Sequence, residues 1–86
     1  MDEYIILNND VTVQNTHCLE DGSNLFVYIT GDYDLMEMLT LFSVPANTQV
    51  IMASRFGEKS TYTGYTELYS MSREYGNINL IMKKGA

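Results

Sequence analysis

The residue types best suited to nucleophilic chemistry stand side by side at His17 and Cys18, the only histidine and the only cysteine of the chain. Nucleophilic catalysis needs a nucleophile, a base within hydrogen-bond reach and a group that orients the base. Neighbouring residues of a β-strand point to opposite faces of the sheet. We therefore predict that these two side chains form no catalytic pair, and a lone cysteine can form no disulfide within the chain.

A second candidate group is acidic and consists of Asp32, Asp34 and Glu37. Clustered carboxylates can act as general acid and base or hold a hard cation. These three fall where a helix is expected to begin, and Asp34 followed by Glu37 resembles a capping box that also complements the helix dipole. We predict that they cap the helix, and we keep them as candidates for contacting a basic partner.

Residues 59–70 read KSTYTGYTELYS and place Tyr62, Tyr65 and Tyr69 around one glycine. A β-bulge at Gly64 would bring the first two rings to one face of the strand. Two interpretations stay open. The rings either line an interface or groove, where a tyrosine buries its ring and keeps its hydroxyl paired, or pack as ordinary cross-strand pairs.

The basic residues, above all Arg55 and Arg73, are candidates for holding a small anionic ligand if several copies of the chain bring them together. Otherwise they are scattered surface charges. The glycines lack the spacing of a phosphate-binding loop, and His17 has no Cys/His cluster around it that would form a metal site. We predict no enzyme, no metal and no cofactor.

The 86 residues predict a single domain, 1–86, whose 45% hydrophobic and 12% aromatic content is typical of a folded protein. So small a domain is marginally stable unless disulfides, a metal or oligomerisation support it. Because neither of the first two is expected, we predict a homo-oligomer. Short apolar runs, an acidic start and a single thiol favour a cytoplasmic protein without a membrane partner.

Charge is divided unevenly along the chain. Residues 1–43 carry eight acidic residues and no lysine or arginine, whereas residues 44–86 carry all five basic residues and three acidic ones, so the two halves are −8 and +2 and sum to −6. Direct nucleic-acid binding needs a basic footprint, and we predict none. The acidic half either meets a basic partner or a neighbouring copy, or simply keeps the protein soluble.

Alternation and turn signals predict an α+β fold with the order β-β-β-α-β-β-β, in which two antiparallel meanders are joined by one short helix. The expected strands are 3–9, 11–20, 24–31, 48–56, a strand through the tyrosine segment, and 77–84, with turns at Asp21-Gly22 and Tyr75-Gly76. The expected helix is 32–43, with one apolar stripe formed by Leu35, Met38, Leu39 and Phe42 and its end set by Pro45. One short helix can cover only part of six strands. Their remaining apolar faces must be covered by sheet curling, by a second sheet layer as in a small sandwich, or by a partner chain.

The segment YTGYTELYSMSREYGNINLIMKKG, residues 62–85, resembles the ending of small uncharacterised proteins encoded by phages and prophages of Gram-positive gut bacteria. The likeness lies in Gly64-Tyr65-Thr66 and in the closing Lys83-Lys84-Gly85. It implies a phage accessory or structural protein in the host cytoplasm, and it brings no assigned catalytic or binding residues with it.

Two hypotheses follow from this resemblance. In the first, the protein is a structural or assembly accessory that works through oligomeric contacts, for example head-to-tail contacts between its unlike halves. In the second, it is an anti-defence protein. It would either sequester an anionic nucleotide signal between subunits, with Tyr65 and Arg73, or block a host nucleic-acid-binding effector with Asp32, Asp34 and Glu37.

Overall fold

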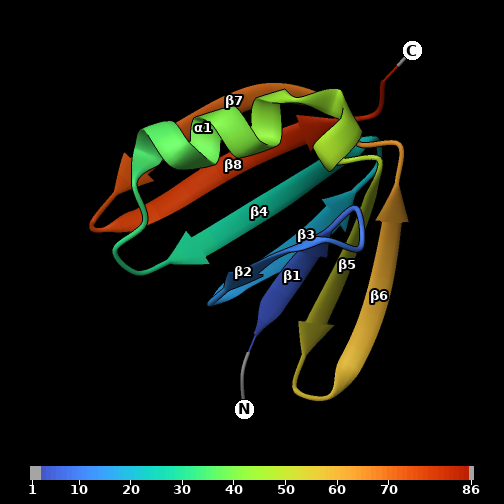
Figure 1. Cartoon of the computed structure of the whole chain (residues 1–86), viewed down its shortest axis with the longest axis horizontal. Helices are drawn as coiled ribbons and strands as arrows, with labels where there is room; N and C mark the ends of the chain where they lie inside the picture. Colours follow the sequence, from blue (N-terminus) through green and yellow to red (C-terminus); the bar gives the residue numbers. More distant parts are fainter. Residues whose placement is uncertain (1–2, 86) are drawn as a thin grey trace.

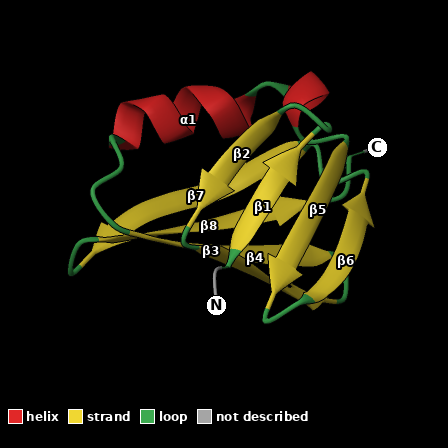
Figure 2. Cartoon of the chain, turned by 60° about the horizontal axis from the view of Figure 1, so that its bottom comes forward, coloured by secondary structure: helices red, strands yellow, loops and turns green. Residues whose placement is uncertain are grey.

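The computed structural model describes residues 3–85, which form eight strands, one α-helix and one short 3-10 helix. The strands build two four-stranded antiparallel sheets, with the helix along one side (Figures 1 and 2). The elements are β1 (Tyr4–Leu7), β2 (Val11–Gln14), β3 (Thr16–Asp21), β4 (Asn24–Thr30), α1 (Leu35–Ser43), η1 (Pro45–Asn47), β5 (Val50–Arg55), β6 (Glu58–Thr63), β7 (Glu67–Glu74) and β8 (Asn77–Lys83).

Sheet A has the strand order β2-β1-β5-β6, and sheet B has the order β3-β4-β8-β7. The α+β class is confirmed, but the two meanders are wrong. Each sheet is made of two hairpins, one from each half of the chain, joined through the pairs β1–β5 and β4–β8. The two halves of the sequence are therefore interleaved throughout the fold.

Two expected strands are each broken in two, which raises the strand count from six to eight. The strand expected over 11–20 breaks at Asn15, whose φ is 55°, and the tyrosine strand breaks at Gly64, whose φ is 81°. A left-handed residue ends the regular alternation of side chains and redirects the backbone. At both points the chain leaves sheet A and enters sheet B, so we call them the Asn15 corner and the Gly64 corner.

The turns follow local sequence more closely. Phe56-Gly57 and Tyr75-Gly76 connect their hairpins with two left-handed residues each, with φ values of 52° and 85° and of 51° and 83°. Such turns match the twist of the flanking strands, and a glycine in the second place makes them favourable. The predicted turn at Tyr75-Gly76 is thus confirmed. The hairpin predicted from Asp21-Gly22 is also present, but its turn lies one residue later, at Gly22-Ser23, between the paired Asp21 and Asn24.

The helix begins where the acids indicated. Asp34 is its N-cap, and its carboxylate accepts a hydrogen bond of 3.0 Å from the backbone N–H of Met36. Pro45 follows the helix and starts η1. Met38 and Phe42 are the buried residues of α1, whereas Leu39, which was expected in the same apolar stripe, is 37% exposed.

The core lies between the inner faces of the two sheets and is closed on one side by α1. It contains Ile5, Leu7, Val13, Leu25, Val27, Ile29, Met38, Phe42, Ile51, Ala53, Tyr65, Ile78, Leu80 and Met82. Of the three ways foreseen to cover the strands, a second sheet layer is the one observed for these inner faces. Their burial therefore needs no partner chain, and the expected homo-oligomer has to be argued on other grounds.

Candidate functional site

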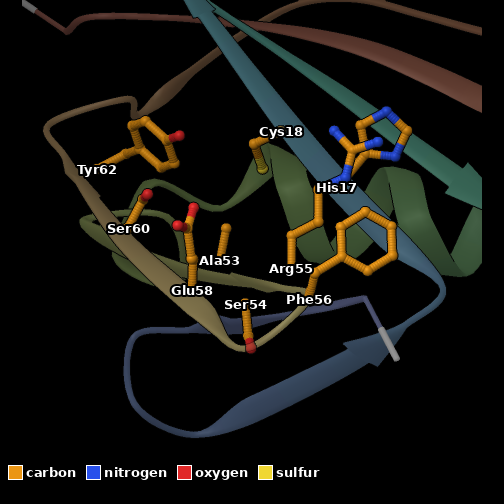
Figure 3. A pocket seen from close by; sticks show the side chains of 9 residues that line it. All are labelled: His17, Cys18, Ala53, Ser54, Arg55, Phe56, Glu58, Ser60 and Tyr62. Carbon is orange, nitrogen blue, oxygen red and sulfur yellow. The ribbon is translucent and has the colours of Figure 1, made fainter. Parts of the chain in front are cut away.

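A pocket of about 300 Å³ opens between β3 and the hairpin β5–β6 (Figure 3). We call it the β6 pocket. Its lining residues are His17, Cys18, Ala53, Ser54, Arg55, Phe56, Glu58, Ser60 and Tyr62. Two predicted binding residues, Arg55 and Tyr62, thus meet in one pocket, but the contribution of β3 was not foreseen, because only the packing of the two sheets brings that strand here.

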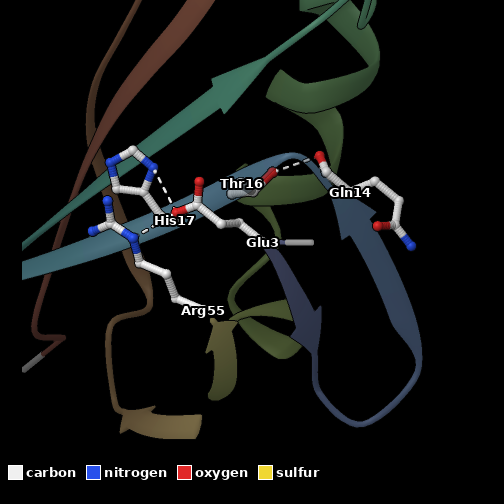
Figure 4. A network of polar contacts seen from close by, with 5 residues as sticks. All are labelled: Glu3, Gln14, Thr16, His17 and Arg55. Atoms are coloured by element: carbon white, nitrogen blue, oxygen red, sulfur yellow. Dashed lines mark hydrogen bonds and ion pairs between the residues drawn. The ribbon is translucent and has the colours of Figure 1, made fainter. Parts of the chain in front are cut away.

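A network of polar contacts borders this pocket (Figure 4). The Nε of Arg55 lies 2.7 Å from Oε2 of Glu3, and Nδ1 of His17 lies 3.5 Å from the same oxygen. The His17 ring also stacks on Tyr28, with 5.0 Å between the ring centroids. Because Glu3 offsets the charge of Arg55 and Glu58 adds a second carboxylate, the pocket presents both signs of charge and is poorly suited to an anion.

Cys18 lines the same pocket but is not an activated nucleophile. Burial raises the pKa of its thiol from 9.0 to about 12, and the thiolate is the reactive form. His17 packs on Tyr28, whereas Cys18 packs against the core. These contacts agree with the expectation that the two neighbours point to opposite faces of β3.

The three tyrosines of the tyrosine segment have three different environments. Tyr65 is fully buried, its hydroxyl donates to Glu20 at 2.5 Å, and burial together with this bond raises its pKa to about 12. The Tyr62 ring meets the Tyr65 ring edge-on at 6.4 Å, so the two do come together, through the Gly64 corner instead of a bulge. Tyr69 is 63% exposed, with the Nζ of Lys83 4.5 Å from its ring centroid.

The acids at the start of α1 are exposed, and the predicted capping is seen at Asp34, whereas no reciprocal bond from Glu37 completes a capping box among the described residues. Arg73 reaches them from β7, because its guanidinium donates to the backbone carbonyl of Tyr33, which lies between Asp32 and Asp34 in the chain. Arg55 likewise pairs with Glu3 of the acidic half. The charge division of the sequence is thus partly undone by folding, and this removes the basis for head-to-tail contacts between a wholly acidic and a basic half.

A second hollow, of about 410 Å³, lies between α1 and the start of β2, and we call it the α1 groove. Its lining residues are Val11, Glu37, Thr40, Leu41, Val44 and Asn47. Of these lining residues, which all belong to the described residues 3–85, Glu37 is the one with a charged side chain. Its two valines are 37% and 42% exposed, and Met36, 64% exposed, lies one helical turn before Thr40 on the same face of α1.

Acidic residues lie in this groove and next to the elements that form it. Glu37 lines the groove, Asp34 caps the helix, Asp32 lies two residues before that cap, and Asp10 directly precedes Val11 of the groove. The sequence signal for this surface was the composition of α1, LMEMLTLFS, which holds more apolar residues than one buried stripe can take up.

Comparisons with protein-family models, with curated proteins and with solved structures gave no match to this chain. In the part of the chain that the structure describes, no three or more His, Cys, Asp or Glu side chains are grouped so that they could hold a metal ion. Nor does any helix of residues 3–85 have the length and apolarity to cross a membrane. Function is therefore inferred from surface geometry and charge.

Proposed function

We propose that this chain is a non-enzymatic phage accessory protein of the structural or assembly type, and that it acts through protein–protein contacts made by the α1 groove. The observation that supports this proposal is an exposed apolar surface with Glu37 in its lining and further acids at the start of α1 and beside Val11. Contiguous apolar surface with a polar rim is typical of interaction sites. The assignment to phage comes from the resemblance of residues 62–85.

The partner chemistry follows from the groove and its rim. Val11 and Val44 of the groove, with Met36 on the same face of α1, offer apolar contact area, while Glu37 in the groove and Asp32 before α1 favour a positively charged partner. A segment of another protein that presents apolar side chains flanked by lysine or arginine complements both features. The apolar contacts would contribute most of the affinity, and the charges would speed association and select the partner.

Of the two forms of the anti-defence hypothesis, we retain the one in which the protein blocks a nucleic-acid-binding effector. A protein that blocks a nucleic-acid-binding effector needs acids beside a contact surface, and the rim of the α1 groove supplies them. The nucleotide-sequestering form has less support, because Tyr65 is buried, Arg73 is engaged by the Tyr33 carbonyl, and Arg55 shares its pocket with Glu58. We therefore retain the blocking form as the second candidate.

The test uses a partner that is recovered from infected cells with the immobilised chain, identified, produced in pure form and titrated by calorimetry. The double variant Val11→Thr with Met36→Gln removes apolar area from the groove and from the helix face beside it while keeping β and helix propensity. We expect it to weaken binding by about tenfold or more, which is about 1.4 kcal/mol per tenfold. The control Tyr75→Asn, at a fully exposed ring whose φ of 51° suits asparagine, should leave affinity unchanged.

A second variant tests the rim. Asp32→Asn with Glu37→Gln leaves the Asp34 cap in place, and we expect weaker binding with a flatter salt dependence. Added double-stranded DNA should not change the binding of a structural partner. If the partner is a nucleic-acid-binding effector, the DNA should compete with this protein and displace it. If the pure partner binds the groove variant as tightly as the unchanged protein, the α1 groove is not the contact surface.

A further inference from the structure

The four edge strands of the two sheets differ in how they are protected. β2 has four residues and lies beside the α1 groove, β7 carries an irregularity between Leu68 and Ser70 and contacts α1, and β3 lies against β1 and β5. β6 begins with two charged residues, Glu58 and Lys59, but it is the outermost strand in both views (Figures 1 and 2), with no proline and no bulge in its six residues. An edge strand that nothing covers can pair with another strand.

The register of the β5–β6 hairpin shows which backbone groups of β6 are free. A two-residue turn makes Arg55 and Glu58 a hydrogen-bonded pair, and such pairs recur at every second residue. The N–H of Gly64 continues this series by donating to the Gln49 carbonyl at 3.0 Å. The even-numbered residues of β6 therefore bond to β5, and the backbone groups of Lys59, Thr61 and Thr63 point away from sheet A.

We propose that β6 pairs with β6 of a second copy of this chain, antiparallel and centred on Thr61. In this register Thr61 faces its own counterpart, and Lys59 faces Thr63 of the second copy, so all three outward-pointing residues find partners and no like charges meet. Each pair can exchange two backbone hydrogen bonds. Centring on Ser60 or on Tyr62 would move one of the outward pairs off the end of the strand.

Side-chain sizes favour the same register. Glu58, Ser60 and Tyr62 face the β6 pocket, so they share one face of the sheet. Pairing centred on Thr61 places Tyr62 opposite Ser60 of the second copy, a large side chain against a small one. Centring on Tyr62 would instead place two tyrosine rings directly opposite each other. Complementary sizes of this kind are what cross-strand neighbours need to pack.

This pairing extends sheet A across a two-fold axis and sets the two β6 pockets on the same face, next to each other. Ser60 of the second copy then borders the pocket that Tyr62 and Arg55 line. β6 and β2 are opposite edges of sheet A, so this contact leaves the α1 groove free and is independent of the proposed function. One six-residue strand pair is smaller than a standard interface, and we expect a weak, concentration-dependent dimer.

The first test is disulfide trapping in a Cys18→Ala background. Thr61→Cys should give a covalent dimer under mild oxidation, because facing residues of a hydrogen-bonded antiparallel pair have Cα atoms about 5.5 Å apart, within disulfide range. Thr63→Cys is the matched control, because Thr63 faces Lys59 of the second copy and lies four residues away from the second Thr63. Thr12→Cys, on the edge strand β2, controls for random collision.

The second test is the oligomeric state in solution. Sedimentation of the unchanged protein at hundreds of micromolar should show a monomer–dimer equilibrium, and Thr61→Lys should shift it to monomer, because two introduced lysines would face each other at the axis. Thermal melting checks that this variant is folded. A monomer at all concentrations, or trapping of Thr63→Cys or Thr12→Cys as fast as Thr61→Cys, would overturn the proposal.

Discussion

The Asn15 corner and the Gly64 corner both lead the chain from sheet A to sheet B, but different contacts hold them. At the first, one left-handed asparagine separates β2 from β3, and backbone bonds hold it, with Thr30 N–H donating to the Asn15 carbonyl at 2.9 Å and Thr16 N–H donating to the Glu3 carbonyl at 3.3 Å. Thr16, fully buried, adds a hydroxyl bond of 2.9 Å to the carbonyl of Gln14.

The Gly64 corner takes three residues and depends on one large side chain. The carbonyl of Gly64 accepts from the N–H groups of Thr66 and Gly85, at 3.0 and 2.9 Å, and Tyr65 points into the core with no exposed surface. A short backbone-held corner and a longer corner anchored by a ring should respond differently to substitution. Stability of the second should depend chiefly on Tyr65.

The largest expected effect comes from removing that ring. Tyr65→Ala should lower the free energy of unfolding by about 3–5 kcal/mol, because truncating a buried aromatic side chain leaves a cavity. Tyr65→Phe, which loses only the hydroxyl bond to the exposed Glu20, should cost about 1 kcal/mol. Urea denaturation at pH 7 measures both, and similar losses for the two variants would show that the bond, not the ring, anchors the corner.

Raising the pH should destabilise the protein first through Cys18, near the Asn15 corner, and then through Tyr65, at the Gly64 corner. Burial raises the pKa of Cys18, three residues past Asn15, from 9.0 to about 12, and burial with the Glu20 bond raises the pKa of Tyr65 from 10.0 to about 12. The unfolded chain releases these protons at lower pH than the folded chain. The contribution of the two groups to the free energy of unfolding is therefore fully present below pH 9 and falls as the pH rises.

The size of this loss follows from the proton difference, at about 1.4 kcal/mol per pH unit for each group. By pH 11 we expect about 3 kcal/mol from Cys18 and about half as much from Tyr65. Urea denaturation gives the free energy of unfolding at each pH between 8 and 11. Its decrease with pH should be less steep from pH 9 upward in Cys18→Ala and from pH 10 upward in Tyr65→Phe. Unchanged slopes in both variants would assign the alkaline loss to other groups.

The parts of the fold that were predicted correctly have causes within a few residues of each other. The Asp34 cap, the turn at Tyr75-Gly76 and the end of the helix before Pro45 depend on local backbone chemistry. The corners were missed because alternation was extended through them. At Asn15 the signal was a change of phase, since Val13 before it and Thr16 after it both face inward, three residues apart.

The candidate sites were harder to foresee, because they depend on long-range packing. Arg55 and Tyr62 share a pocket because β5 and β6 pair, whereas β3 joins that pocket only through the packing of sheet B against sheet A. Arg73 meets the start of α1 because the helix packs against β7, across forty residues of sequence. Neither composition nor periodicity records such contacts, so the sequence named several residues of these candidate sites without grouping them.

The smallest expected effects compare the two left-handed residues themselves. A Cβ added at Gly64 would lie 3.8 Å from Cδ of Lys84, an ordinary contact, so Gly64→Ala should pay only the backbone cost of a left-handed alanine, about 1–2 kcal/mol. Gly64→Asn should cost less, because asparagine adopts this conformation more readily. Asn15→Gly should change stability by less than about 0.5 kcal/mol, since glycine also accepts a φ of 55°. Urea denaturation of the three variants gives the order, and a loss at Asn15→Gly as large as that at Gly64→Ala would mean that the Asn15 side chain, not its backbone conformation, holds the first corner.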